Sequence, residues 1–400
     1  MHRLNRLLQI VVALAVACGL ATQGFAAEPV AAKRNTGLWD VAELSKTPEA
    51  KWGDAQEGVQ EVYYAGEPYR GKPTRVFAYF AKPEGEGPFP AVVLVHGGGG
   101  KAFRDWAVHW QKRGYAALAM DLAGQGPSGW LEDGGPDQGD DAKFRKFSDD
   151  DARDMWTYHA VANVIRGHSL LAARKEVDPQ RTALTGISWG GYLTCIVAGI
   201  DARFQAAVPV YGCGFLAESS VWKDRMSKMT AEERERWTSH WDPSQYVGGA
   251  ACPMLFLNGT NDFAYPLDSY KKTYQLPKSP VTISVVPRLM HGHFWRFPVV
   301  DLFIDSAVNK GVPLPKLDKM EISEGTASAM VESPTKLVGG ELHYAKDDGP
   351  WPHREWQSVP AKIEEGRITA TLPSERPILF YLSVTDDRGA MVTTQHESAR

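Results

Sequence analysis

Hydrophobic residues between about residues 75 and 310 fall in short runs that alternate with longer segments of helical spacing. The runs are apolar almost throughout, and the segments between them place apolar residues three and four positions apart. Strands of this kind, separated by helices, indicate a mostly parallel sheet with helices on both faces. The pattern therefore predicts an α/β fold. Its expected strands include "TRVFAYFAKP", "FPAVVLVHGGGG", "YAALAMDLAG", "QRTALTGIS", "FQAAVPVYG", "CPMLFLNGT" and "VTISVVPRL".

Two of the expected helices flank these strands directly, in "DWAVHWQKRG" and in "GGYLTCIVAGI". A third and longer helix is predicted over 151–174, with acidic residues in its first turn. Two segments interrupt the alternation: 122–150 is rich in Gly, Asp and Pro, and 214–248 carries Trp222, Trp237 and Trp241 among many charges. Insertions after sheet strands commonly form loops or caps over a site. We interpret 214–248 either as a partial lid or as an ordinary pair of surface helices.

The pattern changes after a linker rich in Pro and Lys at 312–319. Short runs of alternating polarity follow, separated by turn residues and without a long helical segment. This pattern is typical of a small all-β domain, an immunoglobulin-like or fibronectin-like β-sandwich, over 320–400. We expect a catalytic domain at 75–311, preceded by an N-terminal extension with the first strands at 27–74.

The first 26 residues have two arginines, an apolar run and a small-residue end, which together predict a secretory signal peptide cut after Ala26. Lipoprotein processing at Cys18 is the alternative. No second apolar stretch is long enough to span a bilayer, so the mature chain is expected to be exported without a transmembrane segment.

The composition of the chain bears on its binding partners and on whether disulfides stabilise it. The net charge of −4 shows no excess of basic residues, which argues against nucleic acid as a partner. Removal of the signal leaves three cysteines, an odd number that excludes a purely disulfide-based scaffold. Cys213 and Cys252 flank one insertion and could pair, whereas Cys195 is expected to pack in a helix.

The stretch "LTGISWGGYL" places Ser188 between Gly186 and Gly190. A strand, a sharp turn carrying a serine, and a helix form a nucleophile elbow, in which the glycines allow close backbone approach. The alternative is a small residue in a glycine-rich loop. The position of Ser188 between an expected strand and an expected helix favours the elbow.

A serine nucleophile needs a histidine base that a carboxylate orients, in the chain order Ser, Asp, His. Asp262 follows the end of an expected strand, and we prefer it to its neighbours Asn261 and Asp268. "MHGHFW" follows the next strand; we expect His291 to be the base, with His293 as the alternative. His-x-His could bind a metal, but no third ligand has suitable spacing, so we expect no metal and no other cofactor.

The tetrahedral intermediate of acyl transfer needs backbone N–H donors. Trp189, directly after the nucleophile, is expected to supply one. The glycine run "HGGGG", which follows a strand, is expected to supply the other from Gly98 or Gly99. The same run lacks the Lys-Ser/Thr of a phosphate-binding loop.

Six segments together resemble secreted bacterial α/β-hydrolases of the acetylxylan-esterase-like, dienelactone-hydrolase-like and prolyl-oligopeptidase-family group, over roughly residues 60–315. They are "VLVHGGGG", "RGYAALAMD", "GISWGG", "PVYGCGF", "LNGTNDFAYPLDS" and "MHGHFW". The resemblance implies the α/β-hydrolase fold with an appended β-sandwich, and a triad at Ser188, Asp262 and His291. Where this chain has "HGH", the family more usually has one histidine followed by a small and then an apolar residue.

These features predict a secreted serine carboxylic-ester hydrolase that acts on a small-molecule or polysaccharide ester, with deacetylation of carbohydrate as the expected reaction. A serine peptidase of the prolyl-oligopeptidase type is one alternative. A non-catalytic glycan-binding protein is another, in which Trp351 and Trp356 would stack on sugars instead of packing in a core.

Overall fold

The computed structural model describes residues 34–295 and 297–400. The predicted signal peptide at 1–26 and the alternative lipidation site Cys18 lie outside the described residues. Within those residues, no helix combines the length and apolar character that crossing a membrane requires.

A nine-stranded sheet carries the candidate site, in the order β1-β2-β3-β5-β4-β8-β9-β10-β11. The first three strands are antiparallel and β3 pairs antiparallel with β5, whereas the strands from β5 to β11 run parallel. The predicted parallel sheet is therefore confirmed, with an antiparallel edge. Its strands are β1 (Ala50–Gln56), β2 (Val59–Ala65), β3 (Arg75–Ala81), β4 (Phe89–Val95), β5 (Ala116–Met120), β8 (Val177–Ile187), β9 (Ala206–Val210), β10 (Met254–Gly259) and β11 (Val281–Val286).

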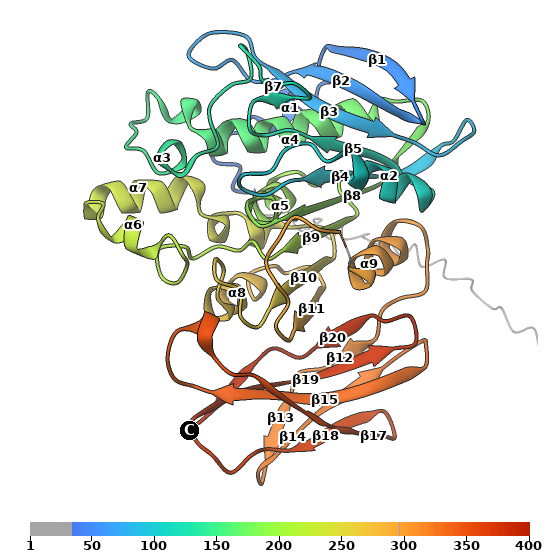
Figure 1. Cartoon of the computed structure of the whole chain (residues 1–400), viewed down its shortest axis with the longest axis vertical. Helices are drawn as coiled ribbons and strands as arrows, with labels where there is room; N and C mark the ends of the chain where they lie inside the picture. Colours follow the sequence, from blue (N-terminus) through green and yellow to red (C-terminus); the bar gives the residue numbers. More distant parts are fainter. Residues whose placement is uncertain (1–33, 296) are drawn as a thin grey trace, which may run out of the picture. The chain divides into compact units, whose positions relative to one another are not determined.

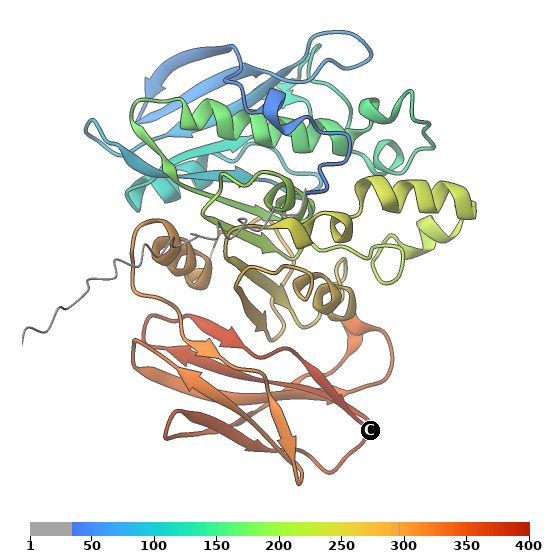
Figure 2. The same ribbon diagram turned by 180° about the vertical axis from the view of Figure 1, so that it is seen from behind.

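Helices cover both faces of this sheet, so its central strands are buried on both sides. Figure 1 shows α2 and α9 in front of the sheet, and Figure 2 shows α4 and α5 on the opposite face. All five residues of β9 are buried, as the continuous apolar run predicts. The helices are α1 (Val41–Leu44), α2 (Arg104–Lys112), α3 (Asp140–Lys143), α4 (Trp156–Ala172), α5 (Trp189–Ile200), α6 (Lys223–Ser227), α7 (Ala231–Trp241), α8 (Leu267–Tyr274) and α9 (Pro298–Val308).

The helix predicted over 151–174 begins later than expected, because α4 starts at Trp156. Asp151 accepts hydrogen bonds from the N–H and the hydroxyl of Ser148, and pairs with Arg145, which holds this segment in a turn. A short 3-10 helix follows, and Met155 is extended at ψ 143°. Asp151 is therefore used in this turn, and Asp154 accepts the N–H of Arg70, so neither lies in the first turn of α4.

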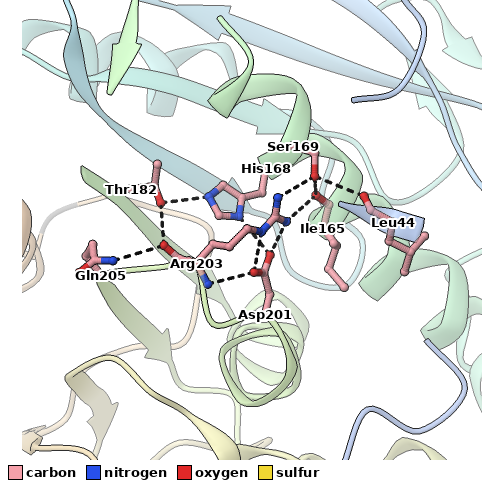
Figure 3. Close-up of polar contacts among 8 residues, drawn as sticks. All are labelled: Leu44, Ile165, His168, Ser169, Thr182, Asp201, Arg203 and Gln205. Atoms are coloured by element: carbon pink, nitrogen blue, oxygen red, sulfur yellow. Dashed lines mark hydrogen bonds and ion pairs between the residues drawn. The ribbon is translucent and has the colours of Figure 1, made fainter. Parts of the chain in front are cut away.

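A buried polar network fastens α4 to the sheet, as Figure 3 shows. His168 Nδ1 lies 3.1 Å from Asp201 Oδ2, and its Nε2 lies 3.0 Å from Thr182 Oγ1. Arg203 bonds both carboxylate oxygens of Asp201, at 2.8 and 2.6 Å. Burial alone would raise the pKa of Asp201, but the hydrogen bonds from His168 and Arg203 hold it well below its usual range. The carboxylate is therefore buried but fully partnered.

The C-terminal residues form two five-stranded antiparallel sheets with a core of their own, which confirms the predicted all-β fold. Buried and solvent-facing residues alternate along β14, as expected for a strand with one face on a core. Trp356 is buried, and the Arg354 guanidinium lies 3.8 Å from the Trp351 ring centroid, so both tryptophans are engaged in packing. The strands are β12 (Lys316–Leu317), β13 (Glu321–Ser323), β14 (Thr326–Glu332), β15 (Leu337–Lys346), β16 (Gln357–Pro360), β17 (Lys362–Glu364), β18 (Arg367–Thr371), β19 (Ile378–Asp386), β20 (Met391–Thr393) and β21 (Glu397–Ala399).

Candidate active site

Ser188 occupies the sharp turn between β8 and α5, as the motif predicts. Its backbone has φ 60° and ψ −120°, a strained conformation for a residue with a side chain. Its N–H donates to the carbonyl of Val210 on the neighbouring strand at 2.9 Å. This geometry is that of a nucleophile elbow, in which the serine stands at the carboxyl end of the strand.

The two flanking glycines are required by close backbone approach. A Cβ on Gly186 would lie 2.4 Å from the carbonyl oxygen of Gly190, and a Cβ on Gly190 would lie 2.2 Å from that of Val95. Real Cβ atoms do not come this close, so neither position accepts a side chain without moving backbone. The glycine spacing of the motif therefore reflects the tight turn of the elbow.

Ser188, His291 and Asp262 form a continuous hydrogen-bonded chain. His291 Nε2 lies 2.8 Å from Ser188 Oγ, and His291 Nδ1 lies 2.7 Å from Asp262 Oδ2. An ionised carboxylate only accepts, so the imidazole proton is on Nδ1 and Nε2 is free to accept from the serine hydroxyl. The structure thus brings together the three residues that the sequence predicts.

Asp262 is buried in the loop after β10 and is held on both oxygens. Its Oδ1 accepts the N–H groups of Ala264 at 2.9 Å and Tyr265 at 2.8 Å, which leaves Oδ2 to face His291. The two competing residues lie elsewhere. The side chain of Asn261 donates to backbone carbonyls of the β-domain, and Asp268 accepts the N–H of Ser269 at the start of α8.

Aromatic rings fix the plane of His291. Tyr211 stacks on it with ring centroids 4.5 Å apart, and Phe263 lies 5.0 Å away with a tilted ring. Tyr211 also donates its hydroxyl to the carbonyl of Met290, at 2.9 Å. These contacts were not anticipated from the sequence, because Tyr211 and His291 are 80 positions apart in it.

His293 has a different environment from His291. Its Nε2 accepts the backbone N–H of Gly97 at 3.0 Å, and its ring lies against Phe103 and Trp106 of the segment that begins α2. Burial lowers its pKa, and the neighbouring His291 lowers it further. With Nε2 committed to Gly97, His293 is not in the chain that reaches Ser188 Oγ.

The glycine run lies beside the serine. Gly98 and Gly99 line the same pocket as Ser188, and a Cβ on Gly98 would lie 2.6 Å from the ring of Trp189. Trp189 is the first residue of α5, so its N–H has no partner within the helix. Among the described residues, the Gly98 N–H donates no backbone hydrogen bond. The two N–H groups are thus available to a ligand oxygen.

A pocket of about 610 Å³ opens over the serine. The 122–150 insertion provides most of its polar wall, as expected of a loop over a site, although the sequence did not single out its members. Exposed aromatic side chains stand at its rim: Trp130 is 63% exposed and Phe263 is 55% exposed. The insertion contributes Gln125, Trp130, Asp137, Gln138, Gly139, Asp140 and Lys143.

Lys143 is a buried ammonium group in this wall. Its Nζ lies 4.7 Å from the Trp156 ring centroid and 4.6 Å from that of Trp189, and it donates to the carbonyl of Gln138. Burial lowers the pKa of Lys143 to about 8. The two indole faces partly replace the water that the cation has lost.

The 214–248 insertion forms the pair of helices α6 and α7, which is one of its two interpretations, and its first part lies at the site. Trp222 lines the pocket and donates its indole N–H to Asp140 at 2.9 Å. Trp237 and Trp241 are instead buried in packing, with 1% and 0% exposure. Only the first part of the insertion therefore borders the site.

The cysteines near this region form no disulfide among the described residues. Within the described residues, Cys195, Cys213 and Cys252 are all free and buried. The pairing considered for Cys213 and Cys252 is thus not formed.

The family model for acetyl xylan esterase (AXE1) matches residues 36–244, more than half of the 400-residue chain. This chain belongs to the acetyl xylan esterase family. The match includes the glycine run and Ser188, and it ends before Asp262 and His291.

Individual relatives are distant. The acetyl esterase Axe7A of Xylanibacter ruminicola is 21% identical over 235 residues, which are 53% of this chain and 51% of the relative. The uncharacterized peptidase YuxL of Bacillus subtilis is 26% identical over 211 residues, 48% of this chain and 29% of that protein. This chain therefore spans about half the length of the first of these relatives and less of the second.

Solved structures support the fold of this acetyl xylan esterase family member. The acetyl xylan esterase from Paenibacillus sp. R4 has a TM-score of 0.55 at 21% identity, covering 68% of this chain and 92% of its own. Acetyl xylan esterase 1 from Thermoanaerobacterium sp. JW/SL YS485 has a TM-score of 0.53 at 21% identity, covering 65% and 92%. The α/β-hydrolase fold implied by the sequence resemblance is confirmed.

Proposed function

We propose that this chain is a serine esterase that removes acetyl groups from carbohydrate through an acyl-enzyme. The observation that carries the proposal is the hydrogen-bonded chain from Asp262 through His291 to Ser188, beside two unpartnered backbone N–H groups and beneath an open pocket. Nucleophile, base, orienting carboxylate and oxyanion donors are the parts that acyl transfer needs.

In the acylation step, His291 Nε2 takes the proton of Ser188 Oγ as the oxygen attacks the ester carbonyl carbon. The carbonyl oxygen becomes an oxyanion, which the N–H groups of Trp189 and Gly98 stabilise. Asp262 stabilises the imidazolium that forms and keeps it oriented. Collapse of the tetrahedral intermediate breaks the bond to the alcohol, which leaves with the proton from His291.

The second step releases the acid. Water enters through the open side of the pocket, His291 removes a proton from it, and the hydroxide oxygen attacks the acyl carbon. The bond to Ser188 Oγ breaks, the proton returns to the serine, and acetic acid leaves as acetate. The same two N–H groups stabilise both tetrahedral intermediates.

A sugar ester suits the pocket wall. Trp130 presents an exposed aromatic face at the rim, and amide, carboxylate and ammonium groups of Gln125, Asp137 and Lys143 line the interior. An aromatic face packs on the apolar side of a sugar ring, and such polar groups can bond its hydroxyls. Membership of the acetyl xylan esterase family supports acetyl as the acyl group.

The proposal also includes secretion of the protein and the division of the chain into domains. The signal-like pattern at 1–26 supports secretion. We assign catalysis to 75–311, with a linker at 312–319 and an accessory β-domain at 320–400. Export is tested by fractionating cells that express the full chain and determining the N-terminus of the protein recovered outside the cytoplasm; retention of the intact chain in the cytoplasm would contradict it.

The activity is tested with a fluorophosphonate probe and with nitrophenyl acetate. Wild-type protein should be labelled and should hydrolyse the ester, whereas Ser188→Ala should lose labelling and at least about 10³-fold in kcat. Equal hydrolysis by Ser188→Ala would exclude the serine mechanism. A glycan-binding protein without catalysis would bind acetylated xylan and show neither labelling nor turnover.

The substrate is tested by a panel of acetylated xylan, other acetylated sugars, feruloyl esters and proline-containing peptides. The proposal expects acetate release from the acetylated sugars at the highest kcat/KM. Preferred cleavage of peptides would instead identify a peptidase. Preferred cleavage of feruloyl esters would show that the enzyme removes feruloyl groups and not acetyl groups.

A further inference from the structure

Two histidines hold the two peptide groups that flank the Cα of Gly97. His293 Nε2 accepts the Gly97 N–H at 3.0 Å, and His96 Nδ1 lies 2.7 Å from the Gly97 carbonyl oxygen. The Gly100 N–H also donates to that carbonyl, at 3.0 Å. The space is tight, because a Cβ on Gly97 would lie 2.7 Å from His293 Nε2.

The backbone determines the tautomer of each imidazole. His96 Nε2 accepts the N–H of Leu122 at 2.8 Å, so its proton is on Nδ1 and is donated to the Gly97 carbonyl. His293 Nε2 accepts from Gly97, so its proton is on Nδ1. A protonated His293 would present an N–H to another N–H and would lose this bond.

Because a peptide group is planar, these contacts determine the direction in which the Gly98 N–H points. The carbonyl of Gly97 and the N–H of Gly98 belong to one trans peptide group and therefore point in opposite directions. With the carbonyl held toward His96, the Gly98 N–H is directed away from it. Gly98 lines the pocket together with Ser188 and Trp189. Glycine has no Cβ to restrict its torsions, so this direction depends on holding both flanking peptide groups.

We infer that His293 is a positioning residue of the oxyanion hole: it fixes the Gly97 peptide and so aims the N–H of Gly98 at the developing oxyanion. This inference rests on the proposed function, because it assigns Gly98 as a donor in acyl transfer. His293 has no part in proton transfer, which belongs to His291.

The surroundings of His293 are suited to a neutral imidazole. Phe103 and Trp106 flank its ring, with centroids 5.4 and 6.4 Å away. The titratable groups that face it are His291 on its own loop and His96 on the glycine loop; Lys143 contributes further positive charge at His96. Burial and His291 lower the pKa of His293, so the bond to Gly97 persists near neutral pH.

Two substitutions separate positioning from packing. His293→Phe keeps a flat ring against Phe103 but removes the acceptor, whereas His293→Gln supplies a carbonyl oxygen that can accept the Gly97 N–H. His353→Phe, at an exposed histidine of the β-domain, is the matched control. Each is measured on nitrophenyl acetate across pH 5–9, with thermal unfolding recorded alongside.

We expect His293→Phe to lower kcat by about ten- to hundredfold with KM within about twofold, less than the loss of an entire oxyanion donor. His293→Gln should recover most of this loss, and His353→Phe should match wild type. A wild-type kcat in His293→Phe, or no recovery in His293→Gln, would overturn the inference. So would an active His291→Ala beside an inactive His293→Phe, because His293 would then be the base.

A measurement without turnover separates this inference from the proposed function and does not depend on the variants being well folded. In the full chain with ¹⁵N-labelled histidine, long-range ¹H–¹⁵N spectra at pH 8 should show for His293 a protonated Nδ1 and an unprotonated Nε2. A protonated Nε2 would overturn the inference even if the esterase is active. Inactivity of wild type with the expected tautomer would count against the proposed function alone.

Discussion

Asn261 donates its side-chain amide to the backbone carbonyl of Arg354 at 2.8 Å and to that of Pro352 at 3.1 Å. Asn261 directly precedes Asp262, so the loop that carries the carboxylate of the candidate triad is bonded to the β-domain. The loop before His291 is bonded there too, because Arg288 Nη2 donates to the carbonyl of Trp356 at 3.1 Å. The C-terminal β-strand region is thus hydrogen-bonded to two of the three loops of the site.

Loss of this support should reduce turnover. Asn261→Ala removes both bonds and leaves two carbonyls to find other partners, so we expect kcat to fall by about three- to tenfold and stability by about 1–2 kcal/mol. Steady-state kinetics and urea unfolding measure the two effects. Asn309→Ala, at an exposed asparagine distant in sequence from the triad, is the control; equal kcat in both variants would show that the β-domain does not position Asp262.

The buried network at Asp201 should be important for stability but not for chemistry. Asp201→Ala leaves His168 and Arg203 without their carboxylate, which should cost about 3–5 kcal/mol. Asp178→Ala breaks a half-exposed pair with Arg181 and should cost less than about 1 kcal/mol. Urea unfolding compares them. A loss below about 1 kcal/mol in Asp201→Ala would mean that packing alone fastens α4.

The elbow should tolerate no added methyl group. Gly190→Ala places a Cβ 2.2 Å from the carbonyl oxygen of Val95, so we expect a loss of several kcal/mol or no soluble protein. Gly71→Ala has open space but a φ of +72°, so only the conformational cost of about 1–2 kcal/mol should remain. Thermal unfolding of the two variants measures the difference, and equal stability would contradict the tight elbow.

The exposed rim of the pocket should contribute to the binding of acetylated xylan and not to the binding of a small ester. Trp130→Ala removes an indole that is 63% exposed, so KM for acetylated xylan should rise by about fivefold or more, the loss of roughly 1 kcal/mol or more of aromatic contact. KM for nitrophenyl acetate should stay within about twofold. A parallel rise for both esters would assign Trp130 to the structure of the pocket.

Stability should fall as the pH falls from about 6.5 to 4. Burial lowers the pKa of His96, His159 and His343 to about 4 and that of His396 to about 3. In this pH window these histidines bind protons in the unfolded chain but not in the folded chain. Acidification therefore lowers the free energy of unfolding through each of them. For a shift from 6.5 to about 4, the loss between pH 7.5 and 5 is about 2 kcal/mol per histidine.

His343 allows this to be measured separately. His343→Gln removes one titrating group from the β-domain core, so the fall in unfolding free energy between pH 7.5 and 5 should be smaller by about 2 kcal/mol than in wild type. His353→Gln, at an exposed histidine, should leave the fall unchanged. Equal pH dependence in wild type and His343→Gln would mean that the pKa of His343 is the same in the folded and unfolded chain.

Much of the site was predictable because its parts follow strand ends. Ser188 comes directly after β8, and Asp262 and His291 lie in the loops that follow β10 and β11. The carboxyl ends of parallel strands meet at one edge of a sheet, so these loops come together. The strained turn at Ser188 is also encoded locally, since Gly186 and Gly190 are the residues that such a turn requires. The late start of α4 was not predictable from its acidic residues, because Asp151 is drawn into a turn by Ser148 and Arg145.

The sequence by itself determined the α/β class, the elbow, the order of the candidate triad and the separate β-domain, because periodicity and turn chemistry are local properties. Tertiary structure decided the distinction between the two histidines of "HGH". They are two positions apart in sequence, yet His291 reaches Ser188 and His293 reaches Gly97. That difference depends on which distant backbone and side-chain groups the fold brings to each ring, and no local pattern encodes it.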